Sequence, residues 1–209
     1  MIVFLVRHGE VAPVRPGAYY GGTEVPLSER GLEEARQAAR FLADCPLDGV
    51  CSSPLGRARR GAEEILRLQP GRPLRLVPDF REIDRGAWTG WTPEELERLR
   101  PGEQAAEAAD PAGWKGHGGE SRAELRQRVL RAFDALVADA RERGWRRWAL
   151  VSHLWPTRAV LARALGREIE EWEEIPVPTG SISALEPEAG RVLWTGRRPG
   201  IPAPPARPL

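Results

Sequence analysis

The sequence predicts an α/β fold, in which a mostly parallel central sheet carries helices on both faces. Three observations lead to this prediction. Short apolar runs alternate with segments of helical periodicity between Ile2 and Val77, which is typical of a parallel sheet sandwiched by helices. The first apolar run, Ile2–Val6, is unbroken and rich in β-branched residues, which indicates a strand buried on both faces. Finally, 209 residues can bury a substantial core without disulfides or a structural metal.

The first half of the chain follows a strand–helix–strand–helix–strand order. Ile2–Val6 is the first strand, and the polar loop 9–27 follows it. Ser28 is a residue type that caps helices, and the helix after it has an apolar face formed by Leu32, Ala35, Ala39 and Leu42. The remaining elements predicted here are a strand over 49–52, a helix over 55–68 and a strand over 74–77.

Residues 79–120 interrupt this order, and we expect them to form an excursion above the sheet. Within the excursion, Thr92-Pro93-Glu94-Glu95 predicts a helix start. Ser121 and Glu124 form a second capping box, which begins the clearest helix of the chain. After it we expect a strand over 148–152, a helix over 156–165 and an edge hairpin of 181–185 with 191–194. We therefore predict one domain over 1–196 and a Pro-rich tail over 197–209.

Composition and charge exclude several functional classes. The 31 basic and 30 acidic residues leave a net charge of +1, so nothing in the overall charge favours nucleic acid or an anionic membrane as a partner. No apolar run is as long as a signal peptide or a membrane span, and we expect a cytoplasmic protein. Cys45 and Cys51 are expected to be reduced thiols. Lys115 is the only lysine and asparagine is absent, which fits a heat-adapted source, although a GC-rich genome gives a similar bias.

Two of the three histidines directly follow a predicted buried strand. His8 follows the strand that begins at Ile2, and His153 follows the strand over 148–152. In open α/β sheets, ligands bind beyond the carboxyl ends of the strands, so both rings are expected to face one crevice. Arg7 precedes His8, and Arg57 lies at the start of a helix, where free N–H groups favour anions. Two histidines and at least two arginines suit a dianion, most simply a phosphoryl group.

Each of these residues taken alone is more often structural than functional, and only their convergence favours a site. A metal is the main competitor for two histidines. A metal would need a third ligand, and no Asp or Glu stands at these strand ends. His117 lies between two glycines and is interpreted as a loop residue. We therefore expect neither a metal nor a cofactor.

Six short segments carry a more specific signal. They are R-H-G at 7–9, G-G-T-E-V-P-L-S-E-R-G at 21–31, S-S-P-L-G-R-A at 52–58, R-E-I-D-R-G-A-W-T-G at 81–90, G-G-E-S at 118–121 and V-S-H at 151–153. In type and order they resemble the motifs of the histidine phosphatase superfamily, whose members include cofactor-dependent phosphoglycerate mutases and many phosphatases. The R-H-G motif alone would be weak evidence for this family, whereas the whole set of motifs in the family's order is a strong resemblance.

The resemblance implies a division of roles. His8 would be the nucleophile and carry the phosphoryl group as a phosphohistidine. The phosphoryl oxygens would be held by Arg7, Arg57 and His153. Glu82 would protonate the leaving oxygen and then deprotonate the hydrolytic water. Without the resemblance, Glu82 cannot be chosen over its acidic neighbours Asp79 and Asp84.

The resemblance also implies substrate contacts from Gly21, Gly22 and Ser121. Ser121 has two explanations, as a helix cap and as a phosphate neighbour, and both can hold together. Where the family usually has Gly-Gly after the second histidine, this chain has Leu154 and Trp155. The Leu154 N–H remains available to substrate. We expect Trp155 to offer an aromatic face that favours ring-bearing monophosphates over 3-phosphoglycerate.

The leading hypothesis is a metal-independent phosphomonoesterase that acts on a small phosphorylated metabolite. One alternative is a cofactor-dependent phosphoglycerate mutase, but Val14 stands where such mutases carry Asn. The segment after S-S-P-L-G-R-A, Arg59-Arg60-Gly61, also differs from the usual family motif, and this difference affects the expected shape of the pocket. A second alternative is an inactive phosphate- or phosphoprotein-binding module, which would not need a nucleophile and an acid together. The expected partner is a small-molecule substrate, and a homodimer is left open.

Overall fold

The computed structural model describes residues 1–12 and 15–200 and contains one six-stranded sheet in the order β3-β2-β4-β1-β5-β6. Four strands run parallel, namely β1 (Ile2–Arg7), β2 (Gly49–Ser52), β3 (Leu74–Leu76) and β4 (Arg147–Ser152). The antiparallel pair β5 (Ile182–Glu186) and β6 (Arg191–Arg197) completes one edge. The predicted fold class, with its mostly parallel sheet and edge hairpin, is confirmed.

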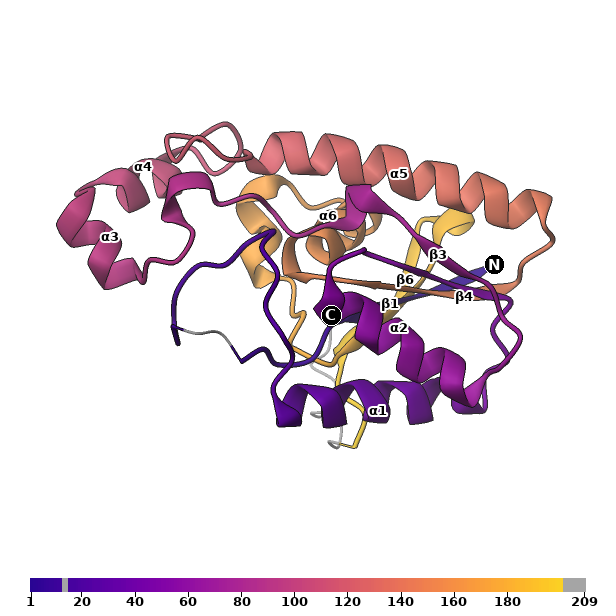
Figure 1. Ribbon diagram of the computed structural model, residues 1–209. Coiled ribbons are helices and arrows are strands. Elements are labelled where there is room, and N and C mark those ends of the chain that lie inside the picture. Colours follow the sequence, from indigo (N-terminus) through magenta and orange to yellow (C-terminus); the bar gives the residue numbers. More distant parts are fainter. Residues whose placement is uncertain (13–14, 201–209) are drawn as a thin grey trace.

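Helices cover both faces of this sheet (Figure 1). One face carries α1 (Glu29–Ala43) and α2 (Gly56–Leu68), and the other carries α5 (Arg122–Glu142) and α6 (Leu154–Leu165). Successive residues of β1 point to opposite faces, so Val3 and Leu5 pack with α5 and α6, whereas Phe4 and Val6 pack with α1 and α2. The continuous apolar run of β1 is therefore buried on both sides, as predicted.

The predicted helix caps are present. Ser28 accepts a hydrogen bond from the Gly31 N–H at the start of α1. Ser121 begins α5 with a complete capping box, in which its hydroxyl accepts from the Glu124 N–H. Because an N-terminal cap is a local property of a few residues, the sequence could predict it without knowledge of the fold.

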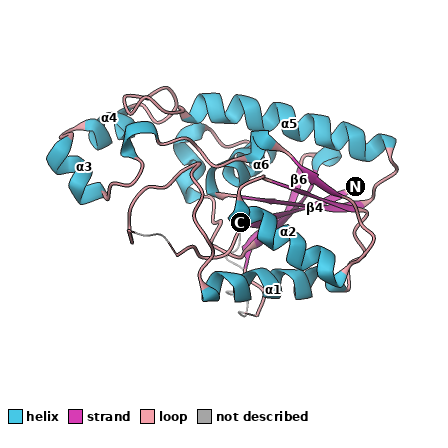
Figure 2. Cartoon of the chain, viewed as in Figure 1, coloured by secondary structure: helices cyan, strands magenta, loops and turns pink. Residues whose placement is uncertain are grey.

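The excursion over 79–120 projects beyond the sheet, with α3 and α4 at its far end (Figures 1 and 2). Its elements are the 3-10 turns η1 (Pro78–Phe80) and η2 (Gly86–Trp88), then α3 (Pro93–Leu99) and α4 (Glu103–Ala109). Thr92 caps α3 as predicted. α4 was not predicted, because it has no buried residue and no side-chain cap, and so carries no apolar periodicity.

α6 begins at Leu154, two residues before the predicted start at Pro156. Pro156 is the third residue of α6, where its missing N–H costs no helical hydrogen bond.

The 3-10 turns η3 (Ile169–Glu174) and η4 (Pro187–Ala189) lie in the C-terminal part. β6 ends at Arg197, and residues 201–209 of the predicted tail lie outside the described residues. None of the described helices is both long and apolar enough to cross a membrane.

Candidate active site

The carboxyl ends of β1, β4 and β2 bring together residues that are far apart in the sequence. The N–H of His8 donates to the Ser152 carbonyl at 3.0 Å, and the N–H of Ser53 donates to the Val151 carbonyl at 2.9 Å. The ring centroids of His8 and His153 are 5.0 Å apart, and the rings meet edge to face. The predicted convergence of two histidines at one edge of the sheet is confirmed.

His8 is held with one ring nitrogen free. Its Nδ1 lies 2.7 Å from the Gly9 carbonyl oxygen, which can only accept, so the ring hydrogen is on Nδ1 and the lone pair is on Nε2. A Cβ at Gly9 would collide with the Gly31 carbonyl, so only glycine allows this turn to pack against the start of α1. Burial holds the pKa of His8 well below its usual value, and the nearby charges of Arg7 and Arg57 lower it further. A neutral, oriented imidazole of this kind can act as a nucleophile.

His153 is fully buried and is oriented by Ser53. Its Nε2 lies 2.8 Å from the Ser53 hydroxyl, which accepts the Leu55 N–H at 3.3 Å. When the hydroxyl donates to Nε2, the hydrogen of the neutral ring is on Nδ1. Nδ1 is buried and has no hydrogen-bond partner within residues 1–12 and 15–200. This N–H can therefore donate to an oxygen atom of a ligand.

Burial also holds the pKa of His153 well below its usual value, and the charges of His8, Arg57 and Arg7 act in the same direction. Both imidazoles are therefore neutral at neutral pH in the unliganded protein.

Arg57 is almost completely buried and is held by backbone carbonyls. Its two terminal nitrogens donate to the carbonyls of Thr23 at 2.6 Å and Gly21 at 2.7 Å. Gly21 has a φ of +41°, and a Cβ there would collide with the Ile83 carbonyl, so the turn that holds Arg57 needs glycine. The guanidinium also lies over the Tyr20 ring, 5.4 Å from its centroid.

Arg7 is held in the same way, since its Nη1 donates to the Val177 carbonyl at 2.5 Å. In the described part of the chain, neither Arg7 nor Arg57 forms an ion pair with a carboxylate, and the Nε of each is buried without a partner. Both positive charges therefore remain available to an anion.

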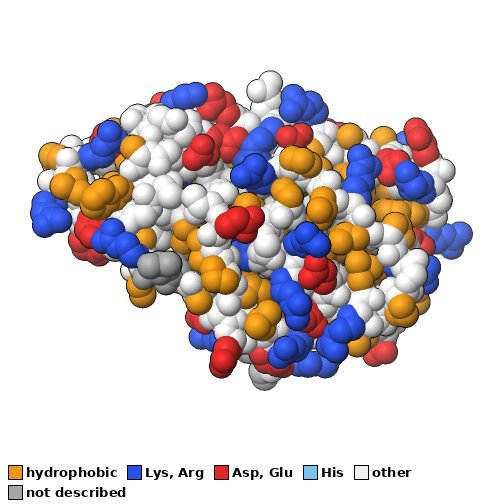
Figure 3. All heavy atoms as spheres, viewed as in Figure 1, with side chains coloured by type: hydrophobic (Ala, Val, Ile, Leu, Met, Phe, Trp, Pro, Cys, Tyr) orange, Lys and Arg blue, Asp and Glu red, His pale blue; other side chains and the backbone are white. Residues whose placement is uncertain are grey.

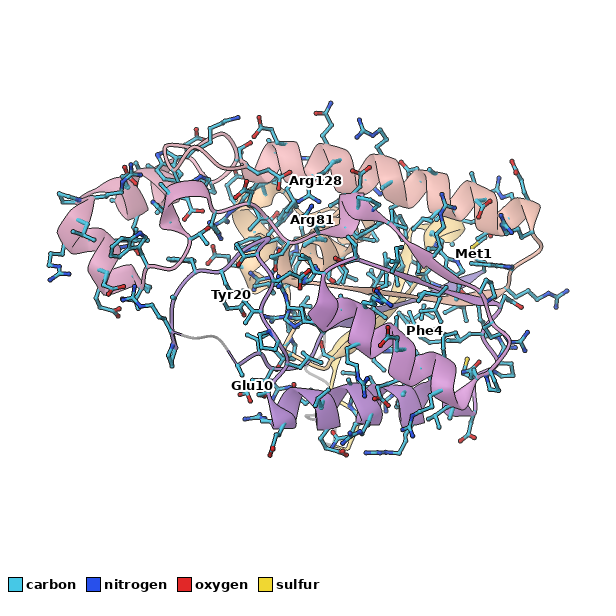
Figure 4. The ribbon with its side chains drawn as sticks, viewed as in Figure 1. Met1, Phe4, Glu10, Tyr20, Arg81 and Arg128 are labelled. Atoms are coloured by element: carbon cyan, nitrogen blue, oxygen red, sulfur yellow. The ribbon has the colours of Figure 1, made fainter. Side chains whose placement is uncertain are left out.

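Glu82 lies at the amino end of α6. Its Oε2 accepts the Leu154 N–H at 3.0 Å, and its Oε1 accepts the N–H groups of Trp155 at 3.2 Å and Ile83 at 3.0 Å. The Leu154 N–H that was expected to face substrate therefore has the Glu82 carboxylate as its partner. Glu82 and Gly22 line a cleft of about 870 Å³, whose other walls include Arg81 and Arg128 (Figure 4).

The two acidic neighbours of Glu82 have other partners. Asp84 accepts the Gly86 N–H at 2.9 Å, and Asp79 lies 3.8 Å from Arg131. Ser121 takes part in its capping box, in which its N–H donates to the Glu124 carboxylate at 2.9 Å. Of these three acidic residues, Glu82 is the one whose carboxylate contacts the helix that follows His153.

Trp155 does not present an open aromatic face. Its side chain is 8% exposed and belongs to the core cluster that lies beneath α5 and α6. The Arg122 guanidinium covers the ring at 4.2 Å from its centroid. The expected platform for a ring-bearing leaving group is therefore buried and covered by charge.

Two residues near the site were given no role from the sequence. Ser53 was read only as part of its motif, although its position directly after β2 could have identified it. Tyr20 lies on the loop after β1 (Figure 4). Burial raises the pKa of Tyr20, and the charges of Arg7 and Arg57 oppose that shift. Among the described residues, no group of three or more His, Cys, Asp or Glu side chains is placed to hold a metal ion.

Comparisons with known proteins agree with this geometry. A family model described as "Histidine phosphatase superfamily (branch 1)" matches residues 3–197. The chain is 31% identical over 192 residues to phosphoserine phosphatase 1 of Hydrogenobacter thermophilus, covering 90% of this chain and 88% of that protein. It is 32% identical over 172 residues to the glucosyl-3-phosphoglycerate phosphatase of Mycolicibacterium vanbaalenii, covering 80% and 76%. The crystal structure of the α-ribazole phosphatase from Shigella flexneri superposes with a TM-score of 0.84 at 26% identity, covering 95% and 97%.

Proposed function

The chain belongs to branch 1 of the histidine phosphatase superfamily and is a phosphoric monoester hydrolase, and from this premise we propose that it hydrolyses a small phosphorylated metabolite through a phosphohistidine on His8, without a metal or cofactor. The observation that carries this proposal is the hydrogen bond from His8 Nδ1 to the Gly9 carbonyl, which leaves Nε2 as the nucleophile. The relatives named for phosphoserine and for glucosyl-3-phosphoglycerate support a small-molecule substrate.

In the first step, the Nε2 lone pair of His8 attacks phosphorus, and the bond from phosphorus to the ester oxygen breaks. Glu82 enters this step as the protonated carboxylic acid and gives its proton to that oxygen, so the product leaves as an alcohol and Glu82 becomes a carboxylate. In the second step, water attacks the phosphohistidine, and Glu82 takes the proton from the water as the P–N bond breaks. Inorganic phosphate is released and His8 returns to its neutral form.

The phosphoryl oxygens carry most of the charge during both steps. Arg7 and Arg57 would supply the positive charge that balances it, and His153 would donate from its buried Nδ1. Because these donors are already held by carbonyls and by Ser53, little reorganisation is needed when charge builds up.

The proposal is tested by incubation with p-nitrophenyl phosphate in the presence of EDTA. Release of nitrophenol under these conditions supports the phosphatase and contradicts the inactive binding module. Incubation with 3-phosphoglycerate, with and without 2,3-bisphosphoglycerate, separates a phosphatase from the alternative mutase. Val14, which argues against the mutase, lies outside the described residues.

The proposal also covers the domain organisation, the cellular location and the source of the enzyme. We propose a single catalytic domain over 1–196, a cytoplasmic location and a heat-adapted source. Ion pairs spaced i,i+4 on α2 support the last point, namely Arg59 with Glu63 at 2.9 Å on the surface and Arg60 with the buried Glu64 at 2.7 Å. Figure 3 shows acidic and basic side chains interspersed over the visible face. A thermal melt of the purified protein tests this part.

A further inference from the structure

Glu82 lies in an irregular stretch of backbone. Residues 81–85 connect η1 to η2 and belong to no helix or strand, so no ladder of regular hydrogen bonds fixes them. A catalytic group that is displaced by about 1 Å can cost about 100-fold in rate. The contacts that fix this stretch therefore bear directly on the proposed acid.

Arg128 of α5 holds the backbone just before the proposed acid. Its Nη1 donates to two carbonyl oxygens, that of Asp79 at 2.6 Å and that of Arg81 at 3.0 Å (Figure 4). The carbonyl between them, that of Phe80, accepts the Ser152 hydroxyl at 2.9 Å. Three consecutive carbonyls are thus held by two side chains that come from other elements, α5 and β4.

Glu120 fixes Arg128 and the far end of the same stretch. Its carboxylate accepts from Nε of Arg128 at 2.5 Å and from Nη2 at 2.7 Å, and the two side chains are only 20% and 16% exposed. The Glu120 N–H donates to the Asp84 carbonyl at 3.0 Å. At Gly119, a Cβ would lie 2.4 Å from the Asp84 carbonyl oxygen, so the two segments pack closely. The pair of Arg128 and Glu120 therefore holds the backbone on both sides of Glu82.

The contacts of Arg128 favour an orienting role over a binding role. Arg128 lines the cleft beside Glu82, but each of its three guanidinium nitrogens already has a protein partner. Glu120 also balances its positive charge. A planar fork paired with a carboxylate has a defined geometry as well as a favourable energy, which suits a group that holds a neighbouring backbone in place.

We propose that Arg128, held by Glu120, is a positioning residue that sets the location of the Glu82 carboxyl group against the leaving oxygen. This inference rests on the proposed function and concerns how its acid is held. Arg128 contacts the backbone before Glu82 and not His8. Its loss should therefore impair protonation of the leaving oxygen and leave attack on phosphorus unchanged. A residue that only stabilises the fold would affect all substrates alike.

The test compares a substrate that needs the acid with one that does not. Glycerol 3-phosphate has an alkoxide leaving group, whereas the nitrophenolate of p-nitrophenyl phosphate needs little protonation. Arg128→Gln should lower kcat/KM by about 100-fold for the former and by less than about threefold for the latter. The loss should fall on kcat, with little change in KM. Arg128→Lys should recover part of it, since it keeps the charge but loses the planar fork.

A second measurement places Arg128→Gln in the Glu82→Gln background. It should cause no further loss with glycerol 3-phosphate, because the group that Arg128 positions has already been removed. Arg131→Gln is the matched control. Arg131 lies on the same helix, is 71% exposed and approaches only the Asp79 carboxylate, at 3.8 Å. This variant should hydrolyse both substrates at the wild-type rates.

Equal losses on the two substrates in Arg128→Gln overturn the proposal, as does a further loss of about 100-fold in the Glu82→Gln background. If Arg128→Gln does not fold, Glu120→Gln gives the same comparison, because it removes the charged partner of Arg128. A loss confined to glycerol 3-phosphate supports the proposal, and equal losses overturn it. Glu82→Gln that slows both substrates equally would refute the acid itself. A wild-type protein that does not hydrolyse p-nitrophenyl phosphate would refute the proposed function.

Discussion

The Glu82 carboxylate accepts the N–H of Leu154, the residue that follows His153, at 3.0 Å. Glu82 comes from the loop after β3 and Leu154 is the first residue of α6, so this contact joins two residues that are 72 positions apart in the sequence. The Glu82 carboxyl group, which we propose as the acid, is thereby held at the amino end of α6, next to the second histidine. Its position depends on backbone N–H groups, which no side-chain substitution at 154 or 155 removes except proline.

The first prediction concerns the nucleophile. His8→Ala should lower kcat by several powers of ten, because it removes the only route through a covalent intermediate. Acid quenching of the wild-type enzyme during turnover should trap phosphate on His8, as detected by mass spectrometry of peptides kept at alkaline pH after the quench. Phosphate found on another residue, or substantial activity in His8→Ala, would contradict the mechanism.

The second prediction concerns Glu82. Glu82→Gln should slow substrates with alkoxide leaving groups far more than p-nitrophenyl phosphate, since nitrophenolate needs little protonation. The measurement is kcat/KM for glycerol 3-phosphate and for p-nitrophenyl phosphate in the same preparation. Asp79→Asn is the control, because Asp79 lies near Arg131 at the surface. Equal losses on both substrates would assign the acid elsewhere, with Asp84 the next residue to test.

The third prediction concerns Ser53 as a positioning residue. Ser53→Ala should reduce kcat/KM by about tenfold, the effect of one lost buried hydrogen bond, because His153 loses the partner that directs its Nδ1–H toward the phosphoryl group. Ser53→Thr keeps the hydroxyl and should restore most of the activity. The pH profile should change in Ser53→Ala, since His153 can then take either neutral tautomer. A uniform loss of stability without a changed pH profile would indicate a structural role only.

The fourth prediction concerns stability against pH. His8 and His153 are buried and neutral, with pKa values well below 6.5. Below pH 6.5 the unfolded chain binds protons that the folded chain does not, so the free energy of unfolding should fall as pH decreases. The loss approaches about 1.4 kcal/mol per pH unit for each histidine. It continues until the pH reaches the folded-state pKa values.

Urea denaturation between pH 7 and pH 5.5 measures this slope. His8→Gln should show a smaller slope than the wild type, because it removes one of the protons taken up on unfolding. A phosphate dianion bound beside the imidazoles raises their pKa values and should also reduce the slope. A stability that does not change over this range would mean that the histidines are not buried as neutral groups.

Local signals made much of the fold predictable from the sequence. Ser28, Thr92 and Ser121 each cap a helix within three residues, and the apolar run of β1 shows burial on both faces. The convergence of His8 and His153 followed from the parallel order of the strands alone. α4 was not predicted, because a helix without a buried apolar face shows no periodic spacing of apolar residues in its sequence.

The environment of Trp155 could not be predicted for a different reason. Arg85, Arg122 and Arg158 come from three separate elements, and only the folded chain brings them to one indole ring. The partner of the Leu154 N–H is likewise a long-range contact, with Glu82. Local patterns predict where an element begins, but they do not show which distant side chain meets it.

The hydrogen bond of the His8 backbone amide also affects how readily this part of the site becomes exposed to solvent. It donates to the Ser152 carbonyl between β1 and β4, the two central strands of the sheet. Amides in such a position exchange with solvent deuterium only when the whole domain unfolds, whereas loop amides exchange through local opening. The His8 amide should therefore be among the slowest exchanging amides of the protein, while the amide of Tyr20, on the loop beside Arg57, should exchange much sooner. The two halves of the proposed phosphate site would then open to solvent on different timescales.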